Sequence, residues 1–371
     1  MKIRTDRADL VERLNTIQGI IPSNTPKPIL ADLRFYTESD RLVAEATDLE
    51  LSGRVFIPKV EISEPGEMAI PCTRLLSIVK EIPEDFVNLS TTGDDPYETL
   101  IESRGYEFKI MGHNPAEFPR TEELEGTQPI TLSRIKLLDS LRRVAVAVSR
   151  DPTRYQLNGV FLEITDGKIQ FTATDGKRLT HDFFKPTQNA GVEISAILPN
   201  QAVDVFLRVL SSQTTQDETV RLNLSETHVS LSTEDTEISS TLIDGLFPDY
   251  RTILPGDARV KVQAKRSALL SAAKSAALTT DKQTSTVLFR IASDALVVES
   301  NSKDIGASKI EIPVECSGEG MEIRFNPVFL IDALRTFEEE NVSLELTEAA
   351  KPTVVRSAHN YVHLVMPLVT K

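Results

Sequence analysis

The chain has 371 residues, 40% of them hydrophobic and 26% charged, and no low-complexity tract, which excludes a disordered or fibrous protein. A usual domain size of roughly 100 to 200 residues predicts two to four folded domains rather than one large core. Residues 1–30 hold no apolar stretch of signal-peptide length, and no run approaches the roughly 18 apolar residues of a membrane span, so we expect a cytoplasmic protein.

Cysteine content and net charge narrow the class further. Cys72 and Cys316 are the only cysteines, which excludes a disulfide framework and a cysteine metal site, and we expect both to be buried. The formal net charge of −14 argues at first against binding to nucleic acid, because phosphate contact needs lysine and arginine. The placement of the charges along the chain therefore matters more than their sum.

Residues 1–125 contain four landmarks in a fixed order. A short strand leads into a basic amphipathic helix at 7–17, and a β-hairpin with a polar turn begins at Leu33. A second helix, opened by a proline, follows at 72–80, and closing strands end near Phe118. The segment reads as one α+β unit.

The same order returns twice, at a period of about 127 to 129 residues. The tripeptide at 46–48 is followed 127 residues later by a similar one at 173–175, and after another 127 residues by 300–302. The corresponding first helices are expected at 133–150 and 265–278, the hairpins from Val160 and Val287, the second helices at 200–210 and 327–336, and the closing strands near Phe247 and the C-terminus. The sequence therefore predicts three copies of one unit.

The predicted fold class is α+β, with three repeated domains that each place two helices on antiparallel sheet. We expect the domains at 1–125, 126–255 and 256–371. A unit of two helices and about eight strands cannot cover its own sheet edges, so three units in series are expected to pair internally and leave two outer edges. A head-to-tail dimer would join these edges into a closed ring of six units. The alternative is an open monomer with covered outer edges.

Positive charge is concentrated in the expected helices. Six stretches, 75 residues in all, hold 15 Lys and Arg against 5 Asp and Glu, which gives +10 there and −24 elsewhere; the stretches are 7–17, 72–80, 133–150, 200–210, 261–276 and 327–336. If the helices share one face, that face attracts phosphate while the acidic sheets repel it. No base-reading helix stands out, so contacts should be to the DNA backbone without sequence preference. The alternative is that these cations only solvate helix surfaces.

Catalytic signatures are absent from the sequence. There is no GxxxxGK[ST], GxGxxG, HExxH or GxSxG motif, and the five histidines are scattered over strands and loops. Two SxxK matches, at Ser133 and Ser271, lack the other elements of that hydrolase signature. We therefore expect no enzyme, no catalytic residue, no metal and no cofactor.

Four segments carry a resemblance to a known family: RYQLNGVFLE (154–163), TATDGKRL (172–179), FPDYRTILP (247–255) and YVHLVMPL (361–368). With the opening MKIRTDRADL, they make the whole chain resemble the bacterial DNA polymerase III beta subunit, the beta sliding clamp family. The resemblance implies a non-catalytic processivity factor in DNA replication, a homodimeric ring whose helices line a channel for double-stranded DNA. The implied partners are replicative and repair DNA polymerases of the holoenzyme, the clamp loader and other proteins with short clamp-binding motifs, and no membrane.

The resemblance also implies an apolar pocket between the second and third domains that captures short linear motifs of these partners. A groove of aliphatic side chains with an arginine at its rim suits a short extended peptide. The matching positions are Leu157, Thr174, Gly176, Lys177, Arg178, Leu179, Pro248, Ile253, Asn326, Phe329, Leu364, Val365, Met366, Pro367 and Leu368.

Two further surfaces are expected from the same resemblance. Ring closure should bury Phe108 and Ile110 of the first domain against Ala277 and Leu278 of the third. The DNA contacts are expected from Arg74, Lys80, Arg143, Arg150, Arg208, Lys274 and Arg335.

The sequence departs from many relatives at several of these surfaces. Lys177 stands where many carry histidine, Gln156 replaces an aromatic residue and Asn24 replaces an arginine, while Thr252 and the end Val369-Thr370-Lys371 also differ. Two readings compete with the clamp. A hydrolase or transferase between repeats would need a polar catalytic constellation, which the sequence lacks, and an open monomeric scaffold would bind peptides but not DNA.

Overall fold

The computed structural model describes residues 1–91, 97–120, 129–187, 193–212, 218–254, 256–281, 285–357 and 360–368. The chain forms two compact units, and the second repeat contributes to both. Unit 1 contains Met1–Leu138, Pro186–Ala190 and Leu198–Ile243; unit 2 contains Asp139–Lys185, Gly191–Ile197 and Asp244–Lys371. The first expected domain limit, between residues 125 and 126, lies within 121–128, and the second lies at residue 255. Both positions are outside the described residues, so these limits stay a prediction.

Six α-helices occur in the described residues, two in each repeat. They are α1 (Arg7–Ile17), α2 (Cys72–Glu81), α3 (Arg134–Ala145), α4 (Asn200–Ser211), α5 (Arg266–Ala277) and α6 (Pro327–Thr336). Leu10, Leu14 and Ile17 recur at helical spacing and are fully buried, which explains why α1 packs on the sheet. Its N-terminus is capped by Asp6, whose carboxylate accepts a hydrogen bond from the Asp9 N–H at 2.9 Å.

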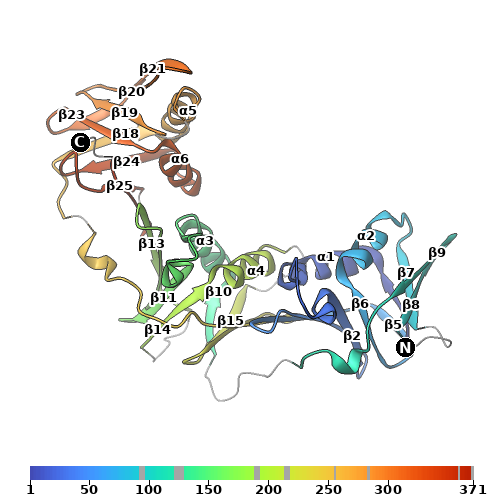
Figure 1. The fold of residues 1–371 in the computed structure, drawn as a ribbon. Helices are drawn as coiled ribbons and strands as arrows, with labels where there is room; N and C mark the ends of the chain where they lie inside the picture. The colour runs from blue at the N-terminus through green and yellow to red at the C-terminus, as the bar shows by residue number, and fades with distance from the viewer. Residues whose placement is uncertain are drawn as a thin grey trace. The chain divides into compact units, whose positions relative to one another are not determined.

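Unit 1 contains two antiparallel sheets (Figure 1). The strand orders are β5-β1-β7-β8-β9 and β10-β15-β16-β17-β4-β3-β2-β6. Their strands are β1 (Lys2–Asp6), β2 (Asp32–Glu38), β3 (Arg41–Thr47), β4 (Leu51–Ile57), β5 (Val60–Glu64), β6 (Glu67–Pro71), β7 (Phe86–Thr91), β8 (Glu98–Ser103), β9 (Tyr106–Met111), β10 (Ile130–Ser133), β15 (Thr219–Leu224), β16 (His228–Ser232) and β17 (Thr236–Thr241). The pairing of β17 with β4 joins the second repeat to the first.

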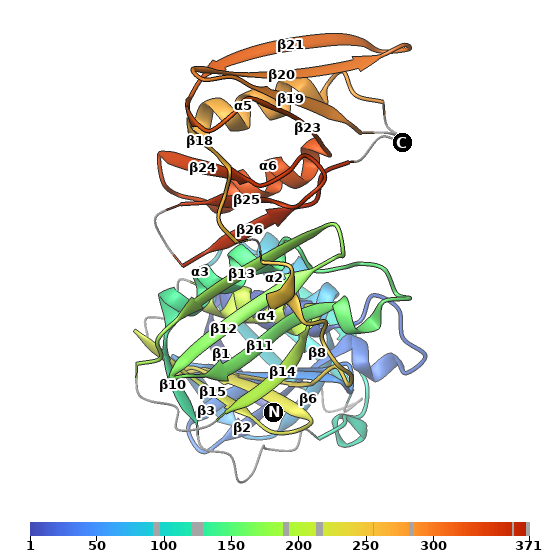
Figure 2. The same ribbon diagram turned by 90° about the vertical axis from the view of Figure 1, so that its left-hand side faces the viewer.

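Unit 2 contains a second such junction, at which β13 pairs with β26 (Figure 2). The strand orders are β14-β11-β12-β13-β26-β25-β24-β18-β22 and β21-β20-β19-β23. Their strands are β11 (Gly159–Thr165), β12 (Lys168–Thr174), β13 (Arg178–Phe184), β14 (Ile194–Pro199), β18 (Val260–Lys265), β19 (Val287–Ile291), β20 (Ala295–Ser302), β21 (Gly306–Pro313), β22 (Glu315–Ser317), β23 (Met321–Phe325), β24 (Asn341–Leu346), β25 (Thr353–Arg356) and β26 (Val362–Val365). Helices α5 and α6 lie side by side on the core of the third repeat.

The predicted fold class of three repeated α+β domains is confirmed. The repeats contain β1–β9, β10–β17 and β18–β26, with two helices in each. Among the described strands, β9 lies at a sheet edge of the first repeat and β21 at a sheet edge of the third. By its place in the repeat, β9 corresponds to β17 and β26, which are paired at the two junctions. In the same way, β21 corresponds to their partners β4 and β13.

Three expectations about local structure were wrong. The helix expected at 133–150 ends at Ala145, and the stretch counted as helical from 261 begins with β18, because burial alternates between Val260, Val262 and Ala264 on one face and exposed neighbours on the other. Cys72 is buried as expected, but Cys316 is partly exposed because β22 is a short strand at a sheet end.

These changes reduce the charge contrast without reversing it. The six helices carry twelve Lys and Arg against six Asp and Glu, a net charge of +6 rather than +10. With a total of −14, the rest of the chain carries −20.

Candidate partner, DNA and ring interfaces

An apolar cluster lies where β13 pairs with β26. Leu179 and Leu364 are directly opposite in this pairing, and both are buried against Tyr250 and Val354. Phe161, Phe247, Leu254 and Val362 pack around them, partly buried. We call the four buried residues with these four neighbours the β13–β26 cluster. It gives the surface above it an apolar base.

The turn between β12 and β13 is fixed by its own side chains. Thr174 Oγ1 accepts from the Gly176 N–H at 3.1 Å, and Asp175 Oδ1 accepts from the Lys177 and Arg178 N–H groups at 2.9 and 3.0 Å. Gly176 has φ +82°, and a Cβ there would lie 2.6 Å from a guanidinium nitrogen of Arg154. The sequence TDGKR therefore presents Lys177 to solvent on a rigid turn.

Arg178 is held in place by two carboxylates and one ring. Its guanidinium lies 3.1 Å from Asp175 Oδ2 and 2.8 Å from Asp332 Oδ2, and it stacks over Phe329 with 4.8 Å to the ring centroid. Only 12% of the side chain is exposed. Arg178 therefore links the turn to α6, and its charge is largely compensated.

The C-terminal segment after β26 is anchored by backbone hydrogen bonds. The Met366 N–H donates to the Lys177 carbonyl at 2.9 Å, and the Leu368 N–H donates to the Arg324 carbonyl at 2.8 Å. Pro367 is buried between them, whereas Met366 and Leu368 are exposed. The tail thus carries two apolar side chains to the surface beside the turn.

A third segment, 246–253, borders the β13–β26 cluster. Phe247 stacks on Phe161 at 4.7 Å between ring centroids, and Tyr250 donates to Glu163 Oε2 at 2.8 Å. Burial, strengthened by this bond, raises the pKa of Tyr250 to about 12, so the phenol stays protonated. Leu246 is 91% exposed, which the sequence analysis missed although it directly precedes the quoted FPDYR segment.

All fifteen residues expected in the peptide pocket belong to unit 2. Leu157, Leu179, Leu364 and Val365 are buried and form supporting structure. The more accessible members are Lys177, Pro248, Ile253, Met366 and Leu368. Asn326 has a structural task in addition, because its side chain caps α6 by accepting from the Val328 N–H at 2.9 Å.

Six of the seven expected DNA-binding residues have exposed side chains. Arg74, Lys80, Arg150, Arg208, Lys274 and Arg335 are exposed, five of them on helices and Arg150 beyond the end of α3. Arg143 instead pairs with the buried carboxylate of Asp182 at 3.4 Å and lies over the Tyr361 ring. Burial raises the pKa of Asp182, and this acid also accepts from Ser140 at 2.8 Å. Arg143 therefore has a structural partner within unit 2.

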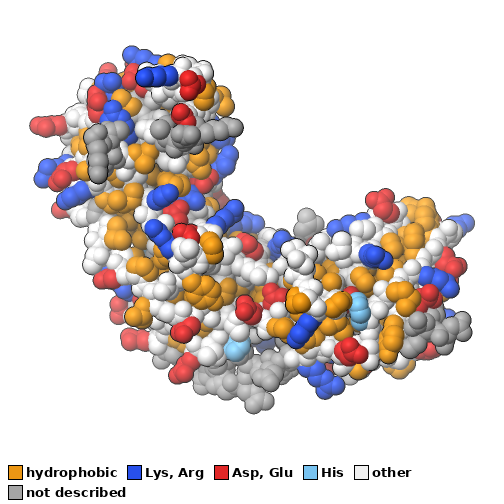
Figure 3. All heavy atoms as spheres, in the orientation of Figure 1, with side chains coloured by type: hydrophobic (Ala, Val, Ile, Leu, Met, Phe, Trp, Pro, Cys, Tyr) orange, Lys and Arg blue, Asp and Glu red, His pale blue; other side chains and the backbone are white. Residues whose placement is uncertain are grey.

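Other basic residues of α3 are more accessible than Arg143. Lys136 and Arg142 are exposed, and neither was singled out from the sequence. Acidic and basic side chains are interspersed on the face shown in Figure 3. The excess of positive charge on the helices is a sum over six elements.

The expected ring-interface residues differ strongly in exposure. Leu278, at the C-terminal end of α5, is 79% exposed, whereas Ile110 on β9 is only 4% exposed within its own unit. Sequence analysis missed three exposed apolar residues at the same two sheet ends: Tyr106 and Met111 on β9 and Ile305 just before β21. Both β9 and β21 are edge strands among the described strands, and an open sheet edge can pair with a strand of another molecule.

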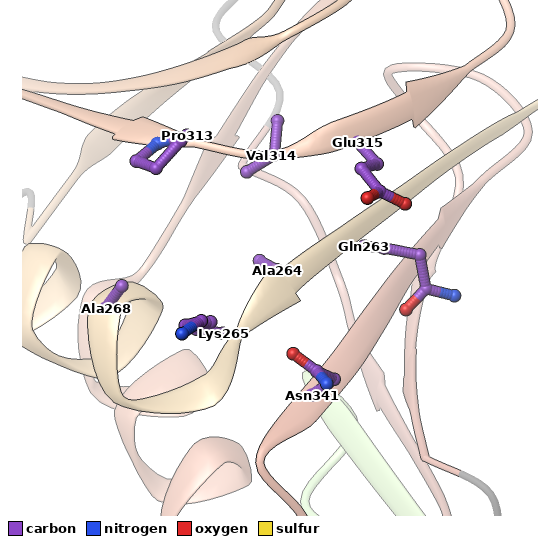
Figure 4. Close-up of a pocket in the computed structure, with 8 residues that line it drawn as sticks. All are labelled: Gln263, Ala264, Lys265, Ala268, Pro313, Val314, Glu315 and Asn341. Carbon is purple, nitrogen blue, oxygen red and sulfur yellow. The ribbon is translucent and has the colours of Figure 1, made fainter.

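A cavity of about 490 Å³ lies elsewhere in unit 2 (Figure 4). Its walls come from β18, the start of α5, the β21–β22 connection and the start of β24. The lining residues are Gln263, Ala264, Lys265, Ala268, Pro313, Val314, Glu315 and Asn341. None of the expected DNA, peptide or ring-interface residues lines it.

The titratable side chains in the described part of the chain form no cluster of the kind that binds a metal ion. No three His, Cys, Asp or Glu side chains gather there as metal ligands would. Burial lowers the pKa of His181 to about 4 and that of His363 to about 3, which keeps both imidazoles neutral, and His359 lies outside the described residues. No described helix is long and apolar enough to cross a bilayer.

Three family models cover almost the entire chain. They describe the N-terminal, central and C-terminal domains of the DNA polymerase III beta subunit and match residues 1–122, 131–249 and 251–369. The chain belongs to the DNA polymerase III beta subunit family. The order of the three models is the order of the three repeats.

Individual beta subunits agree in sequence and in fold. The beta sliding clamps of Chlamydia pneumoniae and Pseudomonas aeruginosa are 29% and 28% identical, over 99% of this chain and 99% and 100% of theirs. The crystal structures of the Thermotoga maritima beta subunit and the Bacillus subtilis sliding clamp superpose with TM-scores of 0.92 at 26% and 25% identity, with both chains fully covered. A Pseudomonas aeruginosa sliding clamp, also at 0.92 and 25%, was crystallised with griselimycin bound.

Proposed function

We propose that this beta subunit is a non-catalytic DNA sliding clamp of the cytoplasm. Two copies form a ring around double-stranded DNA and raise the processivity of DNA polymerases by tethering them. Membership of the family over all three repeats supports this function. The observation that carries the ring is internal to the chain. One type of strand junction is used twice, and among the described strands its two component strands recur at sheet edges, as β9 and β21, each paired on one side only.

The correspondence of the repeats supports one register for the proposed contact between copies. Thr47, Thr174 and Asn301 are equivalent by the 127-residue step, and the strand pairs make Ser52, Leu179 and Ala307 equivalent. Opposite the first two lie Ser239 and Leu364. Successive strand pairs lead from β1, β10 and β18 to the last strand of each repeat. Along these pairs, Lys109 holds in the first repeat the position that Ser239 and Leu364 hold in the second and third. This equivalence supports a contact in which Lys109 of one copy lies opposite Ala307 of the other.

This register gives chemically matched neighbours at three opposed pairs of the contact. On the outer face, Glu107 comes opposite Lys309 and exposed Met111 comes opposite exposed Ile305. On the inner face, Tyr106 comes opposite Ile310. Side chains alternate between the two faces of a strand, so a shift by one residue would put the side chains of every opposed pair on different faces. The matching of charge and of apolar surface supports a head-to-tail homodimer.

Double-stranded DNA is the partner that the helix charge favours. The net +6 on six helices within a chain of −14 attracts phosphate to helical surfaces and repels it from the sheets. Exposed Lys136, Arg142 and Lys274 supply backbone contacts without base recognition. A ring held by such contacts can slide, because no register on the duplex is preferred.

The peptide site belongs to the β13–β26 junction and has no equal at the β4–β17 junction. Leu179 and Leu364 form the apolar base at the former, whereas the equivalent pair at the latter is Ser52 and Ser239. Ile253, Met366 and Leu368 add exposed apolar side chains around that base. A short extended motif with apolar anchors, from a polymerase, the clamp loader or a repair protein, is the ligand we infer.

Retention on DNA tests the proposed function. The protein is loaded on a circular plasmid by a clamp loader, and the plasmid is then linearised. Retention on the circle with rapid loss from free ends is the expected result, since a topological link has no other exit. Equal loss from both forms would overturn the ring and favour a scaffold that binds peptides without encircling DNA.

A further inference from the structure

The cavity of the third repeat has an apolar side and a polar side (Figure 4). The apolar lining consists of Ala264, Ala268, Pro313 and Val314. The carboxylate of Glu315 and the amides of Gln263 and Asn341 lie together, opposite Pro313 and Ala268. A volume of about 490 Å³ is in the range of pockets that hold a ligand, and a few polar groups on an apolar lining are typical of such pockets.

The first repeat shows which side chain fills the equivalent place. Strands β1 and β18 both end at the residue before the first helix of their repeat, which makes Arg4 the equivalent of Gln263. Arg4 lies opposite Glu61 on β5, as Gln263 lies opposite Glu315 on β22. In the first repeat, Arg4 Nη1 is 3.9 Å from Glu61 Oε2. The third repeat thus keeps the carboxylate but has a shorter, neutral side chain opposite it.

A second difference between the repeats enlarges the same place. Phe86 pairs with Asp6 as Asn341 pairs with Lys265, so an aromatic ring of the first repeat is replaced by a small amide in the third. The Arg4 guanidinium lies over the Phe86 ring, 4.7 Å from its centroid. Arginine and ring therefore occupy one region together in the first repeat, and both are missing from its counterpart at the cavity.

The charges at the cavity favour a cation that donates hydrogen bonds. Glu315 is exposed and forms no ion pair with a described residue. The cation of the lining, Lys265, lies 3.6 Å from the carboxylate of Glu340. The side-chain amides of Gln263 and Asn341 each add a carbonyl oxygen that can accept a hydrogen bond. The polar side of the cavity thus offers several acceptors and one uncompensated negative charge.

We propose that this cavity binds an arginine side chain of a partner protein. The guanidinium pairs with Glu315, in the manner of Arg4 with Glu61, and the aliphatic stem lies along the apolar lining. A guanidinium suits the site better than an ammonium group, because its planar fork donates to a carboxylate and to neighbouring carbonyl oxygens at once. The site is a protein contact separate from the proposed peptide pocket, since none of the fifteen pocket residues lines it.

Three fluorescent peptides test the chemistry of the ligand. Gly-Ala-Arg-Ala-Gly is compared with versions in which lysine or citrulline replaces the arginine, and the full chain is titrated into each at low salt. Fluorescence anisotropy should show about threefold weaker binding of the lysine peptide and about fivefold weaker binding of the uncharged citrulline peptide. Equal binding of the arginine and lysine peptides would show attraction to charge alone and would overturn the proposal.

Variants locate the site. Glu315→Gln should weaken binding of the arginine peptide about fivefold, whereas the matched control Glu61→Gln removes an acid that already has Arg4 and should change nothing. Gln263→Arg supplies the arginine from the chain itself and should abolish binding. Truncation after Val365 should leave it unchanged. Binding that survives both Glu315→Gln and Gln263→Arg, or that is lost on truncation, would overturn the proposal without affecting the clamp, which plasmid retention tests separately.

Discussion

Arg54 and Glu237 form an ion pair across the junction between the first and second repeats, with 2.5 Å between Nε and Oε2. They lie on the outer faces of β4 and β17, directly opposite in register. The repeat correspondence places Lys309 and Glu107 at the same two positions of the contact between copies. In the proposed dimer, Glu107 and Lys309 would form the counterpart of this internal ion pair.

A charge exchange at this pair tests the register. Glu107→Lys and Lys309→Glu alone each place like charges opposite one another and should raise the dimer dissociation constant by about three- to tenfold. The double variant restores opposite charges and should recover most of that loss. Sedimentation equilibrium measures all three proteins. If the double variant associates no better than the single ones, the two strands do not pair in this register.

Leu278→Asp should convert the dimer to monomers. The side chain is 79% exposed at the end of α5, so the monomer tolerates a charge there, but a closed ring would have to bury it. Light scattering gives the mass. Ile135→Asp, which changes an exposed apolar residue of α3, serves as the matched control and should leave the dimer intact. An unchanged mass for Leu278→Asp would remove this residue from the interface.

Truncation after Val365 should abolish peptide capture and leave the dimer intact. The deletion removes the exposed side chains of Met366 and Leu368, which follow β26 directly, and the backbone hydrogen bonds to Lys177 and Arg324. Fluorescence anisotropy with a labelled polymerase-tail peptide should show at least about a tenfold loss of affinity. Ile253→Asp probes the exposed end of the 246–253 segment without shortening the chain. Binding that survives both changes would place the peptide site elsewhere.

Alanine substitutions at Arg143 and Arg142 should have different effects, the first on the free energy of unfolding and the second on DNA binding. Arg143→Ala leaves the buried carboxylate of Asp182 without its ion pair and should lower the free energy of unfolding by about 2 to 4 kcal/mol. Arg142→Ala changes an exposed side chain and should leave unfolding unchanged while weakening the salt-dependent affinity for double-stranded DNA. Urea unfolding measures the first effect, and fluorescence anisotropy with a labelled DNA duplex at low salt measures the second. Equal stability of both variants would show that the Asp182 pair contributes little.

His363 should make unit 2 sensitive to acid. Folding lowers the pKa of this buried imidazole from 6.5 to about 3, so between these values the unfolded chain binds a proton that the folded chain does not. The free energy of unfolding therefore has its full value above pH 6.5 and decreases as the pH falls below that, because the unfolded chain gains the proton. His363→Gln should remove about 2 kcal/mol of the decrease in unfolding free energy between pH 6.5 and 4.5. Parallel pH dependences for both proteins would contradict a neutral, buried His363.

Local sequence signals predicted the elements of the candidate sites well but not the pairing of their side chains. The turn at Thr174–Arg178 and the cap at Asn326 follow from residue types known to form such structures. The pairing of Arg143 with Asp182 and the exposure of Leu246 carry no local signal. Both depend on segments that meet only after folding.

The sequence by itself determined that the chain has three related α+β units, because periods of burial along a helix or a strand are written in neighbouring residues. The excess of basic residues on helices was also visible, although its size was overestimated where β18 was read as helix. The tertiary structure alone decided which strand meets which, and in what register. Pairs such as Ser52 with Ser239 and Leu179 with Leu364 join residues nearly 190 positions apart, and such contacts depend on the closure of whole domains rather than on local propensity.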